Sequence, residues 1–289
     1  MSDFVQQGAS TIEFNTCDSW VVLTPIELSI KRKIESVGVP LKDWDIQINY
    51  GIKTGFNDAF IVSTDIRNQI LANCKDDEER RRTEELIRPI LRGRDIKRYG
   101  YEWANLWLIN THNGIKGKLD RIHIEDYPAI KAHLDQYWDK ISTRADKGDT
   151  PYNLRNCAYL DDFSKPKIAW GNLNLSASFS FVEDGFFLNA PCPMIVPGTP
   201  YLLKMLNSDV VDYCIRNLGV TRNGGYFEYK PMFVSQAMIP FRESLSTNLY
   251  TKILSESDEN VINELVAKAF NLSDEEYEFI KSKLKAKYK

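Results

Sequence analysis

The chain is organised around the stretch Ile46-Gln-Ile-Asn-Tyr-Gly-Ile-Lys-Thr-Gly-Phe-Asn-Asp-Ala-Phe-Ile-Val62. Two apolar runs flank Gly51 and Gly55, residues that tolerate positive backbone φ angles, and the side chain of Asn57 can bond its own backbone to set a turn. The pattern predicts a hairpin between two strands. We expect three polar side chains to project from this hairpin and contact a ligand: Lys53, Thr54 and Asn57.

A basic segment, Arg88-Pro-Ile-Leu-Arg-Gly-Arg-Asp-Ile-Lys-Arg98, follows. The whole chain carries a formal net charge of −3, which argues against a general affinity for polyanions. Between residues 80 and 100, however, eight basic residues accompany three acidic ones, a local net charge of +5. Arg80 to Arg82 are typical of a solvated helix face, because glutamates are interleaved with the arginines. We expect the four cations that come last in this stretch to contact a polyanion: Arg92, Arg94, Lys97 and Arg98.

The segment Thr143-Arg-Ala-Asp-Lys-Gly-Asp-Thr-Pro-Tyr-Asn-Leu-Arg155 is too charged, and too rich in helix and strand breakers, to be a buried element. Loops of this length inside a compact domain are more often functional than idle. Farther along, Arg222-Asn-Gly-Gly-Tyr226 is a hairpin signal that carries another candidate, Arg222. The long loop itself offers cations, a ring for stacking and an amide: Arg144, Lys147, Tyr152, Asn153 and Arg155.

The remaining pattern predicts an α+β fold, with a mixed or antiparallel sheet flanked by helices and a small C-terminal helical segment. Apolar residues three or four apart predict one helix over 124–141 and another over 201–218. Short apolar runs between residues 167 and 196 predict an antiparallel meander. We divide the chain into an N-terminal tail (1–18), a main domain (19–242) and a C-terminal helical segment (243–289).

Composition narrows the class of protein. No run of 18 apolar residues occurs and the N-terminus lacks an apolar signal core, so we expect a cytoplasmic protein that spans no membrane. Three histidines and five cysteines without a C-x-x-C pair favour reduced thiols over a zinc site. We therefore expect no bound metal. The cysteines are Cys17, Cys74, Cys157, Cys192 and Cys214.

The order of these motifs resembles a known family. The G-I-x-T-G-x-N-x-A-F pattern at 51–60, followed by P-x-L-R-G-R-D-I-K-R at 89–98, is similar to the target recognition domain of TaqI-like DNA adenine methyltransferases and single-chain type IIG restriction-modification enzymes. Further similar segments lie at 144–155, 164–170 and 201–208. The resemblance extends from about Trp20 to about Pro240 and implies sequence-specific recognition of double-stranded DNA.

The resemblance implies a domain that recognises DNA but has no catalytic motifs of its own. Adenine methylation in the family uses an N-P-P-Y/F motif and a glycine-rich cofactor loop, and the sequence contains neither. The chain is then a C-terminal fragment or a free-standing specificity subunit, and it binds no cofactor itself. S-adenosylmethionine and Mg²⁺ would serve methyltransferase and nuclease domains in the same parent chain or in a separate subunit. Lys and Arg would hold phosphates, while Asn and Arg would read base edges.

Two alternatives remain open from the sequence. Asp212, Glu228 and Lys230 follow the D…E-x-K order of a Mg²⁺-dependent nuclease. Such triplets arise often by chance, however, and Asp212 lies in a predicted core helix. The other alternative is a protein-interaction scaffold whose basic segment packs against acidic helices.

Overall fold

A four-stranded antiparallel sheet in the order β10-β8-β12-β2 lies in the middle of the molecule, with a hydrophobic core on each side of it. The computed structural model describes residues 23–285, so the predicted tail at 1–18 and Cys17 lie outside the described residues. The strands are β2 (Gln47–Tyr50), β8 (Lys167–Trp170), β10 (Phe179–Val182) and β12 (Pro193–Val196).

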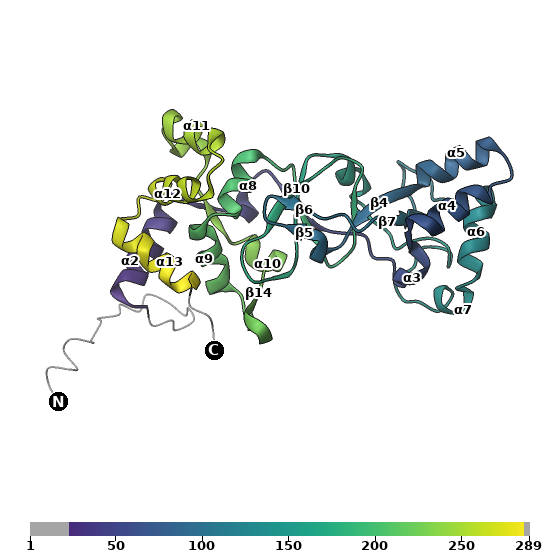
Figure 1. Cartoon of the computed structure of the whole chain (residues 1–289), viewed down its shortest axis with the longest axis horizontal. Helices are drawn as coiled ribbons and strands as arrows, with labels where there is room; N and C mark the ends of the chain where they lie inside the picture. Colours follow the sequence, from purple (N-terminus) through teal and green to yellow (C-terminus); the bar gives the residue numbers. More distant parts are fainter. Residues whose placement is uncertain (1–22, 286–289) are drawn as a thin grey trace.

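Both faces of the central sheet are covered. Successive side chains of a strand point to opposite faces, and Ile168 and Ile195 accordingly enter the first core while Ala169 and Met194 enter the second. Every residue of β8 and β12 is therefore buried. The sheet is the wall that the two lobes share, with helices at either end of the elongated molecule (Figure 1).

The first lobe is mainly helical and includes the C-terminal helices, which pack into the same hydrophobic core as the earlier ones. A helix begins at Pro25 and ends before Gly38, as a proline at the first helical position and a glycine after the last turn indicate. Thr24 and Glu27 form a capping box at its N-terminus. The helices are α2 (Pro25–Val37), α8 (Pro200–Leu206), α9 (Asp209–Leu218), α10 (Pro231–Val234), α11 (Thr247–Ser255), α12 (Glu259–Ala269) and α13 (Asp274–Lys285).

The second lobe is built on a sheet in the order β11-β4-β7-β3. The buried carboxylate of Glu79 accepts hydrogen bonds from the backbone amides of Ala129 (2.9 Å) and Lys75 (3.0 Å), which ties two of its helices together. Its strands are β3 (Ile61–Ser63), β4 (Ile87–Leu91), β7 (Leu106–Ile109) and β11 (Phe187–Leu188). Its helices are α3 (Asn57–Phe60), α4 (Thr64–Ala72), α5 (Asp77–Leu86), α6 (Pro128–Asp135) and α7 (Trp138–Ile141).

Small sheets complete the fold, and one of them contains the hairpin predicted at 222–226, which is confirmed. It has the order β13-β14-β9. The short strands are β1 (Val39–Pro40), β5 (Ile96–Lys97), β6 (Gly100–Tyr101), β9 (Leu173–Asn174), β13 (Thr221–Arg222), β14 (Tyr226–Glu228) and β15 (Met238–Ile239). The α+β class and the C-terminal helical segment are thus as expected from the sequence.

The prediction of a hairpin over 46–62 is wrong. β2 pairs with β12 in the central sheet, whereas β3 pairs with β7 in the other sheet. The intervening residues cross between the lobes, and the amide of Ile52 bonds the carbonyl of Leu188 at 2.6 Å. A Cβ on Gly51 would lie 2.3 Å from that carbonyl oxygen, so glycine is required here for close backbone approach and not for a turn.

The two long helices predicted from periodicity are each divided. Residues 124–141 form a 3₁₀ turn followed by α6 and α7, because Tyr127, the residue before Pro128, leaves helical geometry. Residues 201–218 divide at Asn207, whose side chain bonds both the N–H and the C=O of Phe179 in β10. The expected meander is also incomplete, because β11 leaves it and pairs in parallel with β4.

Candidate nucleic-acid interface

A cleft of about 750 Å³ lies among segments of both lobes, and both polar and apolar groups line it. Lys53 and Lys230 supply positive charge, and a buried side-chain oxygen of Asn172 has no hydrogen-bond partner. Buried polar groups usually have a hydrogen-bond partner, so the unpaired Asn172 oxygen is an unusual feature of this region. Its lining residues are Tyr50, Lys53, Thr54, Gly55, Phe56, Asn57, Asp146, Asn172, Asn189, Ala190, Pro191 and Lys230.

The segment 53–57 forms one wall of the cleft and contains three of the predicted residues. Lys53 and Asn57 are exposed, whereas Thr54 is only 2% exposed. The Thr54 hydroxyl donates a 2.6 Å hydrogen bond to Oδ1 of Asn57. Thr54 therefore orients the Asn57 amide, whose NH₂ group and second oxygen lone pair stay available to a ligand.

The loop 144–155 packs behind that wall through Gly55, which has a φ of +71° and would place a Cβ 2.6 Å from the carbonyl oxygen of Asp146. Arg144 is buried inside the loop. Its guanidinium donates to the carbonyls of Pro151 (2.6 Å) and Asn153 (2.5 Å) and lies over the ring of Phe60. Burial lowers the pKa of Arg144 to about 10.

The other loop candidates divide between interior and surface. Asn153 is buried, and its amide donates to the carbonyl of Ile122 at 2.9 Å. Tyr152 is half-buried and donates from its hydroxyl to Asp135 at 2.6 Å. Lys147 and Arg155 are exposed, the latter paired with Asp146 at 2.7 Å beside the cleft.

The basic segment 92–98 is partly used for internal contacts. Arg92 makes a two-bond contact with Asp95, with Nε–Oδ2 at 2.9 Å and Nη2–Oδ1 at 2.8 Å. Burial opposes the ionisation of Asp95, but the hydrogen bonds from Arg92 outweigh it and lower the pKa of that carboxyl. Arg98 bonds Glu259 of α12 at 2.5 Å and the carbonyl of Ala177 at 3.2 Å. Arg94 and Lys97 remain exposed.

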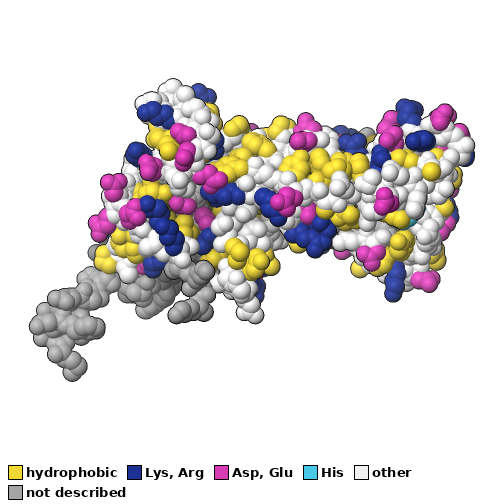
Figure 2. All heavy atoms as spheres, viewed as in Figure 1, with side chains coloured by type: hydrophobic (Ala, Val, Ile, Leu, Met, Phe, Trp, Pro, Cys, Tyr) yellow, Lys and Arg dark blue, Asp and Glu magenta, His cyan; other side chains and the backbone are white. Residues whose placement is uncertain are grey.

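Positive charge is not spread evenly over the surface. Figure 2 shows Lys and Arg side chains mixed with acidic ones at both ends, while a group of basic side chains lies in the middle, near β5. Arg81 and Arg82 at the far end pair with Glu85 and Glu78 one turn away in α5. Those two arginines thus belong to a solvated helix face, as predicted from the interleaved glutamates.

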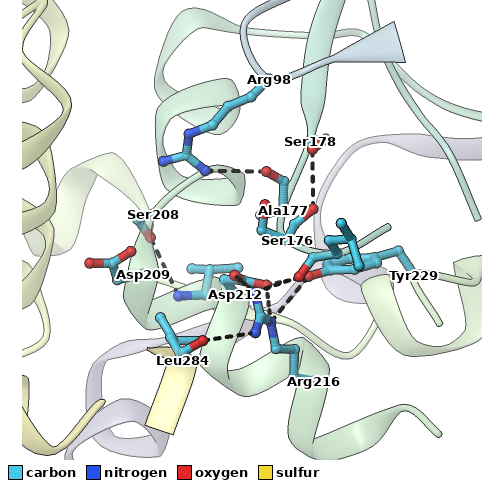
Figure 3. Close-up of polar contacts among 12 residues, drawn as sticks. Arg98, Ser176, Ala177, Ser178, Ser208, Asp209, Asp212, Arg216, Tyr229 and Leu284 are labelled. Carbon is cyan, nitrogen blue, oxygen red and sulfur yellow. Dashed lines mark hydrogen bonds and ion pairs between the residues drawn. The ribbon is translucent and has the colours of Figure 1, made fainter. Parts of the chain in front are cut away.

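The structure keeps Asp212 apart from the other two residues of the nuclease alternative. Arg216 holds Asp212 with a 2.8 Å ion pair and a 3.1 Å hydrogen bond, and the Tyr229 hydroxyl also donates to it (Figure 3). Glu228 instead binds Arg222 and Lys230. Within residues 23–285, no group of three or more His, Cys, Asp or Glu residues could hold a metal ion.

Two further expectations concern the state of the cysteines and the presence of a membrane-spanning helix. Cys74, Cys157, Cys192 and Cys214 are free, and burial raises the pKa of the Cys192 thiol to about 12. No helix within residues 23–285 is long and apolar enough to cross a membrane.

Sequence reasoning missed part of the cleft: Tyr50, Asn172, Asn189 and Lys230 (the last named only for the nuclease alternative). These residues come from β2, from the turn before β9, from the segment after β11 and from the end of β14. They meet only through long-range pairing, such as Tyr229 N to Asn172 O at 2.8 Å. No local pattern in the sequence signals that assembly.

The fold is of the α+β class, and comparisons with known proteins identify its family. The model of the TaqI-like C-terminal specificity domain matches residues 88–240, more than half of the chain. The chain therefore belongs to that family, as its motifs predicted. A search of curated proteins finds no match.

Two solved structures share the fold at low sequence identity. MmeI, a type IIL restriction-modification enzyme solved in complex with DNA, has a TM-score of 0.55 and 14% identity over 84% of this chain. BpuSI, a type IIG restriction endonuclease, has a TM-score of 0.52 and 12% identity over 92% of this chain. The chain spans about a third of the length of each, since 33% of either is covered.

Proposed function

We propose that this chain recognises a specific sequence in double-stranded DNA, as the target recognition part of a restriction-modification enzyme. The family match carries this proposal, because the specificity-domain model covers residues 88–240, which include the cleft residues from Asp146 to Lys230. MmeI and BpuSI support it, because both are restriction-modification enzymes with the same fold.

In its finer form the proposal places the chain in an adenine-methylating enzyme of type IIG in the cytoplasm. The methyltransferase and nuclease domains would lie outside this chain, in the same polypeptide or in a partner subunit. S-adenosylmethionine and Mg²⁺ would be bound there, since the sequence lacks the N-P-P-Y/F motif and residues 23–285 offer no metal cluster. No chemical step is assigned to residues of this chain.

The cleft contains the chemical groups that duplex recognition needs. Lys53 is a single charge on a flexible stem, which suits contact with phosphates, and Lys230 adds a second charge although it also forms an ion pair with Glu228. Asn57, held by Thr54, presents an amide that can make hydrogen bonds to a base edge. Arg94 and Lys97 extend the positive surface beyond the cleft. Arg144, Asn153 and Arg92 support the interface from within, because internal bonds engage them.

Salt dependence of binding tests the role of the cleft. Each lysine that contacts a phosphate adds about 0.9 to the magnitude of the slope of log K against log salt concentration. We expect the K53A/K230A double variant to lose close to two such contacts, so its slope should be shallower by about 1.8 on any duplex. The measurement is a fluorescence anisotropy titration at several salt concentrations.

A matched control is K31A/K268A, which removes two exposed lysines from α2 and α12 in the helical lobe. The control should bind with the wild-type slope. Equal slopes for the wild type and K53A/K230A would show that the cleft does not face the DNA backbone. A wild-type chain that binds no duplex at low salt would overturn the proposed function itself.

A further inference from the structure

A two-stranded ribbon, residues Thr221–Glu228, projects from the first lobe (Figure 1). β13 and β14 pair antiparallel, and the tip between them is Asn223-Gly224-Gly225. Gly224 and Gly225 have φ values of +79° and +77°, and a Cβ on Gly225 would meet no atom within 4 Å. Every residue from Val220 to Gly224 is exposed. The ribbon therefore has a free tip.

The base of the ribbon is rigid. Tyr229, directly after β14, is fully buried, and its carbonyl accepts a 2.6 Å hydrogen bond from Nε1 of Trp170. Its hydroxyl donates to Asp212, which Arg216 also holds (Figure 3). On the other edge, β14 pairs with β9. A ribbon with a rigid base and an exposed tip has a shape that can enter a groove of duplex DNA.

Arg222 stands on this ribbon with one edge of its guanidinium occupied. Nε donates to Oε1 of Glu228 at 2.6 Å, and Nη2 forms an ion pair with the same oxygen. Glu228 is 3% exposed and is held on its other oxygen by Lys230 at 3.1 Å, whereas the Arg222 side chain is 55% exposed. The end of the guanidinium formed by Nη1 and Nη2 is left for a ligand, because an arginine has five N–H donors in a fixed fork.

We infer that the ribbon enters the major groove of duplex DNA and that Arg222 reads a guanine there, with Glu228 as the residue that positions it. This inference rests on the proposed function. The major groove admits a two-stranded β-ribbon, and the commonest base-specific contact is a pair of hydrogen bonds from an arginine to O6 and N7 of guanine. A buried carboxylate that holds the Nε edge turns the remaining two-donor end outward. Lys230 links the ribbon to the cleft, so both belong to one continuous surface.

Exposed hydrophobic side chains surround the ribbon, and a contact with DNA through the ribbon accounts for them. Leu173, Val220 and Tyr226 around it are exposed large hydrophobic residues, and Figure 2 shows hydrophobic side chains gathered where it leaves the body. In a major groove, apolar side chains contact the methyl groups of thymines.

The test begins with selection of the preferred site by the full wild-type chain from a randomised duplex pool. Affinities are then measured for that site, for every single-base-pair change in it, and for a scrambled duplex. We expect one guanine to be preferred over the other bases by on the order of 10- to 100-fold. R222A should abolish that preference at this position alone. R222K keeps the charge but lacks the fork, so it should also lose the preference while it binds scrambled DNA as the wild type does.

E228Q should weaken the preference at the same base pair and at no other. R81A and E85Q are the matched controls, because Arg81 and Glu85 form an exposed ion pair on α5, in the other lobe. Unchanged preferences in R222A, with a wild type that does select a site, would overturn this inference alone. A selected site without a guanine would also overturn it. No duplex binding by the wild type would overturn the proposed function as well.

Discussion

Replacement of Arg144 by alanine should destabilise the fold, although the residue belongs to a charged loop that resembles a surface element. Arg144 is 7% exposed, and its guanidinium holds the carbonyls of Pro151 and Asn153. It also lies 4.3 Å from the ring centroid of Phe60. The truncation therefore unties the loop 144–155 and removes the support behind Gly55 and the cleft.

The magnitude follows from these contacts. Hydrogen bonds to a charged group contribute about 1.5–3 kcal/mol each, and a desolvated cation–π contact about 2 kcal/mol. Against this stands the burial of the charge. The pKa falls from 12.5 to about 10, which corresponds to roughly 3 kcal/mol. The net loss of unfolding free energy in R144A is about 2–5 kcal/mol.

Urea denaturation followed by tryptophan fluorescence measures this loss. The control is R155A in the same loop, whose ion pair with Asp146 is solvent-exposed and contributes at most about 1 kcal/mol. We expect a clear fall in the urea midpoint for R144A and almost none for R155A. Equal midpoints for R144A and the wild type would refute the internal role of Arg144.

Three further outcomes are expected. N57A should retain affinity for scrambled DNA but lose about 1–3 kcal/mol of discrimination at one base pair, and an unchanged profile in a single-base competition series would exclude Asn57 as a reader. R94A should weaken binding to all duplexes alike and reduce the salt slope by about 0.9, whereas a loss confined to one sequence would contradict a phosphate contact. Burial opposes ionisation of Glu276, but bonds from Lys33, Ser29 and the Ser273 amide outweigh it and lower its pKa from 4.5 to about 2. The ionised Glu276 stabilises the fold above pH 4.5, and this stabilisation disappears as the pH falls toward 2. The unfolding free energy of E276Q should therefore depend less on pH between 4.5 and 2 than that of the wild type. The same pH dependence in both proteins would disprove this role of Glu276.

Local signals in the sequence were sufficient for several elements. Thr24, Pro25 and Gly38 define the ends of α2, and Asn223 with two glycines defines the tip of a hairpin. Such signals depend only on neighbouring residues, so they can be read without knowledge of the rest of the fold. Family motifs added the kind of protein.

The hairpin predicted at 46–62 shows where local signals fail. Gly51 and Gly55 are consistent with a turn, but they serve close packing against Leu188 and Asp146, far along the chain. β2 pairs instead with β12, Asn49 opposite Met194, and no local pattern encodes that choice.

The polar loop residues pose a related problem. Arg144 and Arg155 lie at the two ends of the same charged loop, yet Arg144 is buried and Arg155 is exposed. Charge and polarity therefore predicted the region of the candidate interface but not which side chains face outward. The role of Glu228 as a partner of Arg222 likewise depends on the register of β13 and β14.

Selection from a randomised duplex pool with Mg²⁺ present tests the central claim most directly. If this chain is a recognition module without a catalyst, the bound fraction will be enriched in one motif, the affinity for that motif will fall as salt rises, and the DNA will remain uncut. Binding without an enriched motif would contradict sequence-specific recognition. Cleavage of the duplex by the chain alone would contradict the assignment of catalysis to other domains.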